Sequence, residues 1–298
     1  MIFETKAEEE FILKITCMFC GQEKESSKEH IIPKAIGNGS LITDDVCKDC
    51  NSALGETIDD KFVNNGLIDL KRSTYDLKGY GGNAPTPITK GTDEEGNTVR
   101  FDKDLVAHYI PKITDKDGKA MIIAESESEG RKVIKKKLER KNVPKEEIDE
   151  ILKSFKPVQS DDRQQEFTIR MSMELLDWQL EFLKIAFEFM NKEYGDTYKQ
   201  DPIGNKLRSI LNQSMSGKET DCSDYTSGID SSAVSPFIDH FRKENEHIHY
   251  ICIRKYPDNT VSVLIALFDG EISGEVLVSK CGDKYLGTID KRQRIVIK

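Results

Sequence analysis

Four cysteines near the N-terminus occur as two pairs with the spacing of metal ligands. Cys17 and Cys20 form the first Cys-x-x-Cys pair, and Cys47 and Cys50 form the second. Each pair can bring two thiolates to one ion, and four thiolates complete the tetrahedral coordination that is typical of structural zinc. The spacing therefore predicts one zinc ion bound by all four cysteines.

Three further residues in this stretch have side chains suited to acid-base or metal chemistry. Glu29 and His30 stand together between the cysteine pairs, and Asn51 directly follows the last cysteine. An imidazole can take a proton from water near neutral pH, and carboxylate and amide oxygens are ligands that Mg²⁺ accepts. Carboxylates and amides also serve as ordinary helix caps, so a structural role stays open for Glu29 and Asn51.

The order of these motifs resembles the HNH endonucleases over residues 17 to about 64. The matching motifs are Cys-x-x-Cys, Glu-His-Ile-Ile-Pro, Gly37-Asn38-Gly39 and Cys-x-x-Cys-Asn. The resemblance implies a β-hairpin followed by a helix around a catalytic divalent metal, Mg²⁺ or Mn²⁺, in addition to the structural zinc. It implies that His30 is the general base and that Glu29 and Asn51 bind the catalytic metal.

Two positions depart from the usual family pattern. Glu29 stands where aspartate is more common, and Ile42 falls near the position of the family's central asparagine. That asparagine braces the loop between the two strands. We therefore expect the brace to be missing or to be made by another residue.

The flanking sequence predicts the elements that position these residues. Pro33 closes a short strand, which would leave His30 beside a loop. A helix is expected from residue 47 to about 64, and its core-facing side chains recur every four residues. These side chains are Leu54, Ile58 and Phe62.

A second stripe of the same predicted helix contains Asn51, Gly55 and Asp59. At about 1.5 Å of rise per residue, Asp59 would lie roughly 12 Å along the axis from Asn51. Both side chains cannot then bind one ion. Asp59 is therefore expected to have a structural or substrate-positioning role.

The sequence predicts an α+β protein with two domains. A zinc-stapled ββα-metal module is expected in residues 1–80, and a Gly- and Pro-rich stretch over 79–97 marks the boundary. A larger α+β domain is expected over 98–298, with a helical core at 175–213 and a C-terminal antiparallel β-meander at 247–298. The polar stretch 214–235 is expected to be a long loop or linker.

Charge bears on the expected partners. The formal net charge of −9 disfavours binding to nucleic acid through bulk electrostatics, although a metal ion and a local basic track can serve the phosphates. The predicted helix over 131–141 provides such a track through Lys132, Lys135 and Lys136. A solvent-exposed helix face is the competing interpretation of this run.

The composition and the N-terminus favour a cytoplasmic protein. No apolar run is long enough to cross a membrane, and the first residues lack the apolar segment of a secretion signal. We therefore expect no membrane partner.

Three hypotheses of function follow. The first is a metal-dependent HNH endonuclease that hydrolyses nucleic acid, with DNA as the expected substrate. The second is a zinc-knuckle module that binds nucleic acid or protein without catalysis. The third adds a protein or small-molecule regulator that acts through the C-terminal domain, as in host defence or restriction. Sequence specificity, the type of cut and the oligomeric state cannot be derived from the sequence.

Overall fold

The structure is a computed structural model in which the chain folds into two compact units. The first unit combines residues up to 68 with residues from 173 onward, and the second covers 69–172. The structure describes residues 14–79, 82–86, 88–102, 104–116, 119–156, 166–169, 173–285 and 291–298.

A ββα module forms the N-terminal part of the first unit. Its antiparallel sheet has the order β1-β2-β3 and is followed by one continuous helix, whose middle turn is a π-helix. The strands are β1 (Lys14–Thr16), β2 (Glu23–His30) and β3 (Ile42–Cys47), and the helical segments are η1 (Lys34–Ile36), α1 (Lys48–Leu54), η2 (Gly55–Asp59) and α2 (Asp60–Val63). The predicted core stripe is confirmed, because Leu54, Ile58 and Phe62 are all buried.

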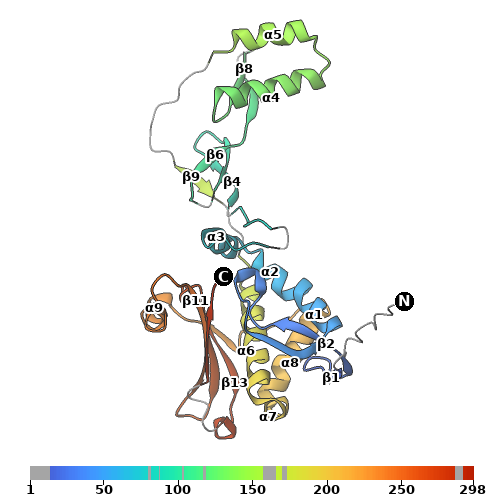
Figure 1. Cartoon of the computed structure of the whole chain (residues 1–298), viewed down its shortest axis with the longest axis vertical. Helices are drawn as coiled ribbons and strands as arrows, with labels where there is room; N and C mark the ends of the chain where they lie inside the picture. The colour runs from blue at the N-terminus through green and yellow to red at the C-terminus, as the bar shows by residue number, and fades with distance from the viewer. Residues whose placement is uncertain are drawn as a thin grey trace, which may run out of the picture. The chain divides into compact units, whose positions relative to one another are not determined.

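A group of helices and a five-stranded antiparallel sheet follow in the same unit (Figure 1). The helices before the sheet are α6 (Leu175–Tyr194), α7 (Asp196–Lys199) and α8 (Pro202–Met215). The sheet has the order β10-β13-β12-β11-β14. Its strands are β10 (Thr226–Gly228), β11 (Ile248–Lys255), β12 (Val261–Leu267), β13 (Ile272–Ser279) and β14 (Arg292–Val296), with η3 (Gly282–Tyr285) before the last strand.

The α+β class and the C-terminal antiparallel sheet are therefore confirmed. Strands β11, β12 and β13 form the predicted meander, whereas β14 returns to pair with the free side of β11. The prediction of a long loop over 214–235 was wrong in its second half. That half contains β10 and the start of helix α9 (Ser231–Asp239), whose Val234 and Ile238 pack on Ile248 of the sheet.

Helix α6 lies between the ββα module and the sheet. Every residue from Leu180 to Asn191 is buried, as expected for a helix that packs on all sides. Phe187 contacts Phe19 of the module, with ring centroids 5.3 Å apart. On the other side, a Cβ atom on Gly274 of β13 would clash with the Phe182 ring, so the sheet needs glycine there.

The second unit has a four-stranded sheet of order β6-β5-β4-β9, a hairpin and two helices. Its small core contains Ile88, Val99 and Phe101. The elements are β4 (Ile88–Asp93), β5 (Thr98–Phe101), β6 (Ala107–Tyr109), β7 (Lys112–Lys116), β8 (Lys119–Ile123), α4 (Glu127–Arg140), α5 (Lys145–Ser154) and β9 (Phe167–Ile169), and helix α3 (Gly66–Thr74) begins at the junction of the units.

This division differs from the predicted domains 1–80 and 98–298. Residues 173–298 group with the ββα module, because the buried α6 contacts both the module and the sheet. Sequence patterns identify α6 as a core helix but do not reveal which elements cover it. Among the described residues, no helix is long and apolar enough to span a bilayer.

Candidate active site and metal centre

The four cysteines converge at the start of the module. Their Sγ atoms all lie within 4.8 Å of one another, and the Sγ atoms of Cys20 and Cys47 are 3.9 Å apart. A tetrahedral zinc ion with bonds of about 2.3 Å separates its sulfur ligands by about 3.8 Å. The cluster therefore has the dimensions of a four-cysteine zinc site.

The surroundings of these thiols also fit a cation. The backbone N–H of Cys47 donates to Cys17 Sγ at 3.4 Å, a contact that stabilises a thiolate. Burial, followed by the neighbouring Cys17, raises the pKa of the Cys50 thiol. Four crowded thiols are thus consistent with structural zinc, which offsets their mutual repulsion when they ionise.

His30 ends strand β2, as predicted, and its side chain is half-buried. Lys28 is exposed on the same strand, whereas Glu29 between them points into the interior. Burial, followed by the positive charges of Lys34, Lys184 and Lys28, lowers the pKa of His30. The imidazole is therefore favoured in its neutral form, which can accept a proton.

Asn38 braces the loop between β2 and β3. Its Nδ2 donates to the carbonyl oxygens of Ile32 and Leu41 at 2.7 and 2.9 Å. Its Oδ1 accepts from the backbone N–H groups of Ser40 and Leu41 at 3.0 and 2.8 Å. The expectation that another residue makes this brace is thus confirmed. Residue 42 is isoleucine, and the buried Asn38 braces the loop from a position earlier in the chain.

The C-terminal sheet holds the same loop from outside the module. His249 of β11 is fully buried, and its Nε2 lies 2.8 Å from the carbonyl oxygen of Ile36. Its Nδ1 accepts from the N–H of Phe268, so Nε2 carries the proton and donates to Ile36. A Cβ on Gly37, which has a φ of +99°, would meet Ile297 at 2.6 Å.

Lys184 of α6 joins Glu29 to Asp59. Its Nζ lies 3.1 Å from Glu29 Oε1 and 2.6 Å from Asp59 Oδ1. It also donates to the carbonyl oxygen of His30 at 3.4 Å. Burial acts to lower the pKa of Lys184, but the carboxylates, Asp59 first, outweigh it and raise that pKa well above its usual value. The ammonium form of this buried side chain is therefore favoured.

Three more facts define the environment of this lysine. Glu29 is only 3% exposed, and burial raises its pKa although Lys184 counteracts the shift. Glu181 and Glu188 flank Lys184 on α6 and are fully buried, which raises their pKa values well above normal. The carboxyl oxygens of Glu188 have no hydrogen-bond partner among the described residues. Glu181 Oε1 lies 3.9 Å from Lys184 Nζ, and burial acts with the neighbouring Asp59 to raise the pKa of Glu181.

Asn51 lies at the start of α1, beside β2. Its Nδ2 donates to Ser27 Oγ and to the carbonyl oxygen of Lys28, both at 3.0 Å. Because only an N–H can donate to a carbonyl, these bonds fix the amide orientation and leave Oδ1 as the atom for a further ligand. The structure thus places Asn51 next to the strand segment that carries Glu29 and His30.

The sequence did not predict that Asp59 and Glu29 share a partner, and it did not identify Lys184 as that partner. The expected structural role of Asp59 fits its ion pair with Lys184 at 2.6 Å. The spacing within the helix did not predict that partner, because Lys184 comes from a distant segment. The available signal for Lys184 was a lysine spaced to meet Glu181 and Glu188 on one face of a largely apolar helix.

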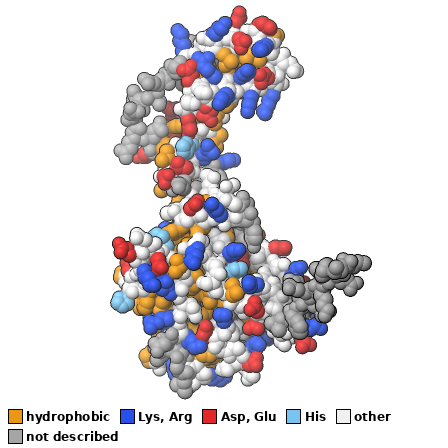
Figure 2. Space-filling model, viewed as in Figure 1, with side chains coloured by type: hydrophobic (Ala, Val, Ile, Leu, Met, Phe, Trp, Pro, Cys, Tyr) orange, Lys and Arg blue, Asp and Glu red, His pale blue; other side chains and the backbone are white. Residues whose placement is uncertain are grey.

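The predicted phosphate contacts Lys132, Lys135 and Lys136 belong to the second unit. All three are exposed on helix α4. Figure 2 shows basic and acidic side chains mixed over helices α4 and α5. Their role in nucleic-acid binding stays a prediction.

A comparison with protein families identifies the ββα module. Residues 17–67 match the family model described as HNH endonuclease. These residues form an HNH domain. Neither a curated protein nor a solved structure gives a significant match to the chain. The match suggests nuclease activity and a nucleic-acid substrate, and the four-cysteine cluster is consistent with structural zinc.

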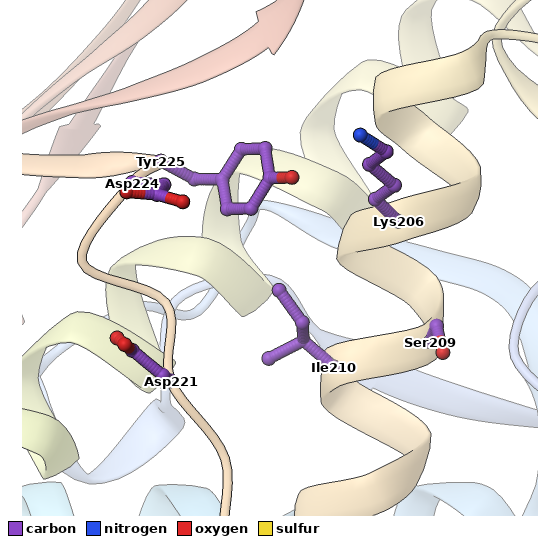
Figure 3. A pocket seen from close by; sticks show the side chains of 6 residues that line it. All are labelled: Lys206, Ser209, Ile210, Asp221, Asp224 and Tyr225. Carbon is purple, nitrogen blue, oxygen red and sulfur yellow. The ribbon is translucent and has the colours of Figure 1, made fainter.

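A surface pocket of about 350 Å³ lies elsewhere, between α8 and the segment after it (Figure 3). None of its lining residues belongs to the HNH domain. They are Lys206, Ser209, Ile210, Asp221, Asp224 and Tyr225.

Proposed function

We propose that the protein is a metal-dependent endonuclease that hydrolyses phosphodiester bonds of DNA. The observation that carries this proposal is His30, a half-exposed imidazole with a lowered pKa at the strand end of an HNH domain. A neutral imidazole in that position can act as general base on water.

The catalytic divalent ion would be held by Glu29 and Asn51. Both offer hard oxygen atoms, which suit Mg²⁺ or Mn²⁺, and the amide of Asn51 already presents its Oδ1. When bound, such an ion neutralises charge on the phosphate and stabilises the departing 3′ oxygen.

The chain's own residues supply the remaining steps. His30 takes the proton from the attacking water, and Asn38 holds the loop that follows His30 through four hydrogen bonds. The exposed lysines Lys28 and Lys34 flank His30, so the phosphate backbone meets positive charge beside the base.

A second function is favoured by the burial of Glu29. A carboxylate that is 3% exposed and paired with Lys184 also suits a structural ion pair in a non-catalytic zinc-knuckle module. The two functions differ in whether the oxygen of Asn51 is needed for a reaction.

The experiment is cleavage of supercoiled plasmid over a titration of Mg²⁺, with EDTA as the blank. The parent should cut only with the divalent ion. Asn51→Ala should need more Mg²⁺ and cut more slowly, because it loses a ligand oxygen. Asn51→Asp retains a ligand oxygen but loses the amide donors to Ser27 and Lys28, so it should need less Mg²⁺ than Asn51→Ala without matching the parent. No cutting by the zinc-loaded parent on plasmid or single-stranded DNA would favour the binding module.

A further inference from the structure

We propose that Lys184 is a positioning residue of the nuclease site, which holds the Glu29 carboxylate in the orientation in which it binds the divalent ion. This inference rests on the proposed function. It places part of the site on α6, more than a hundred residues beyond the HNH match at 17–67.

The contacts of the ammonium group carry the inference. Within the described part of the chain, the Nζ of Lys184 lies near one oxygen each of Glu29, Asp59 and Glu181, the last at 3.9 Å. It also donates to the main-chain carbonyl of His30. Two of these four contacts, including the shorter one to Glu29 at 3.1 Å, are made to the adjacent acid and histidine of the HNH motif. A movement of Lys184 would therefore displace both the metal ligand and the backbone of the base.

The position of Lys184 is itself fixed. Its side chain has no exposed surface, and it stands in the fully buried middle of α6. Phe187 one turn later packs on Phe19 of the module, and Phe182 packs on Phe62 at 6.5 Å between centroids. The helix is thus held on the HNH domain by aromatic contacts on both sides of the lysine.

A purely stabilising role accounts poorly for this arrangement. Desolvating an ammonium and two carboxylates is costly, and apolar residues of similar volume commonly hold a core as well or better. A buried cation that fixes a metal ligand has a geometric function which an apolar residue cannot supply.

The test is Mn²⁺ binding to zinc-loaded protein, measured by electron paramagnetic resonance of the free ion. Glu29→Gln gives the background of surface sites. Lys184→Met should raise the Kd for Mn²⁺ by about tenfold or more, the range seen when a residue supporting a metal ligand is lost. The control is Asp201→Asn, which disturbs another buried carboxylate, bonded to Ser279 and Tyr285, and should leave the Kd unchanged.

A second variant covers the case in which Lys184→Met fails to fold. The double variant Lys184→Met with Asp59→Asn removes one charge of each sign, and so leaves the net charge of the cluster as in the parent. It should also bind Mn²⁺ about tenfold or more weakly, because Glu29 is still unsupported. A folded single or double variant with the parent's Kd would overturn the inference.

The outcomes separate this inference from the proposed function. If the parent binds Mn²⁺ and Lys184→Met does not, but the parent cuts no nucleic acid, then the positioning role stands and the nuclease proposal fails. If the parent cuts plasmid and Lys184→Met keeps its Mn²⁺ affinity, then the nuclease proposal stands and the positioning role fails. A parent that binds no Mn²⁺ above background overturns both.

Discussion

His249 should make the stability of the protein depend on pH in a predictable direction. Burial lowers the pKa of this imidazole from 6.5 to about 4, although its hydrogen bond to the Ile36 carbonyl acts in the opposite direction. The folded protein therefore holds the ring neutral, with Nδ1 accepting from the N–H of Phe268. In the unfolded chain the His249 imidazole therefore becomes protonated as the pH falls through about 6.5, whereas in the folded protein it stays neutral until about pH 4. The stabilising contribution is complete above pH 6.5 and is lost as the pH falls toward 4.

The magnitude follows from the two pKa values. Each unit of difference between the folded and unfolded pKa values is worth about 1.4 kcal/mol of unfolding free energy. The full difference for His249 therefore lowers the unfolding free energy by about 3 kcal/mol once the pH is below 4. Between pH 7.5 and pH 5 the linkage relation gives a loss of about 2 kcal/mol. This window avoids the strongly acidic range, in which zinc-bound thiolates are protonated.

The assay is urea unfolding at steps from pH 7.5 to 5, on the parent and on His249→Gln. Glutamine does not titrate, and its amide N–H can donate to the same carbonyl oxygen of Ile36. The difference in unfolding free energy between parent and variant isolates His249, since the other groups titrate in both. That difference should shift by about 2 kcal/mol in favour of the variant toward pH 5. A difference that stays constant with pH would refute the assignment of a buried neutral imidazole.

Three other changes have defined outcomes. Cys47→Ser should reduce the bound zinc, measured by elemental analysis, well below one ion per chain. It should also speed hydrogen exchange of residues 17–64. A full zinc content in this variant would exclude a four-cysteine site. Asn38→Ala should lower the unfolding free energy by about 3 kcal/mol, since four hydrogen bonds of the loop are lost, with Asn38→Asp losing less; an unchanged urea midpoint would show that the brace is dispensable. Charge reversal of Lys132, Lys135 and Lys136 to Glu should weaken DNA binding and reduce the dependence of the binding constant on salt, as measured by fluorescence anisotropy. An unchanged salt dependence would show that these lysines of α4 face solvent and do not contact phosphates.

The sequence was informative where a local spacing determines the structure. The Cys-x-x-Cys pairs predicted the cysteine cluster, and the four-residue spacing of Leu54, Ile58 and Phe62 predicted the buried helix face. The length of α6 was also predictable, because its apolar pattern ends at Gly195. Each of these features depends on residues that are neighbours in the chain.

The remainder depends on contacts between distant segments. Lys184 meets Glu29 only because α6 packs against the HNH domain, and His249 meets Ile36 only because the C-terminal sheet covers the loop. The π-helical turn Gly55–Asp59 has no reliable local signature, so the direction of the Asp59 side chain was not predictable. Asn38 lay inside the recognised motif, but its role as the brace became visible only through its four hydrogen bonds.

The central claim is that His30 is the general base of a nuclease, and single-turnover cleavage by His30→Ala tests it most directly. The variant should keep its zinc and its Mn²⁺ affinity, while the cleavage rate falls by about 100-fold or more through loss of the base. His240→Ala, which alters an exposed histidine outside the HNH domain, is the matched control and should cut like the parent. A folded, zinc-loaded His30→Ala protein that cleaves DNA as fast as the parent would contradict the claim and make His30 a structural residue.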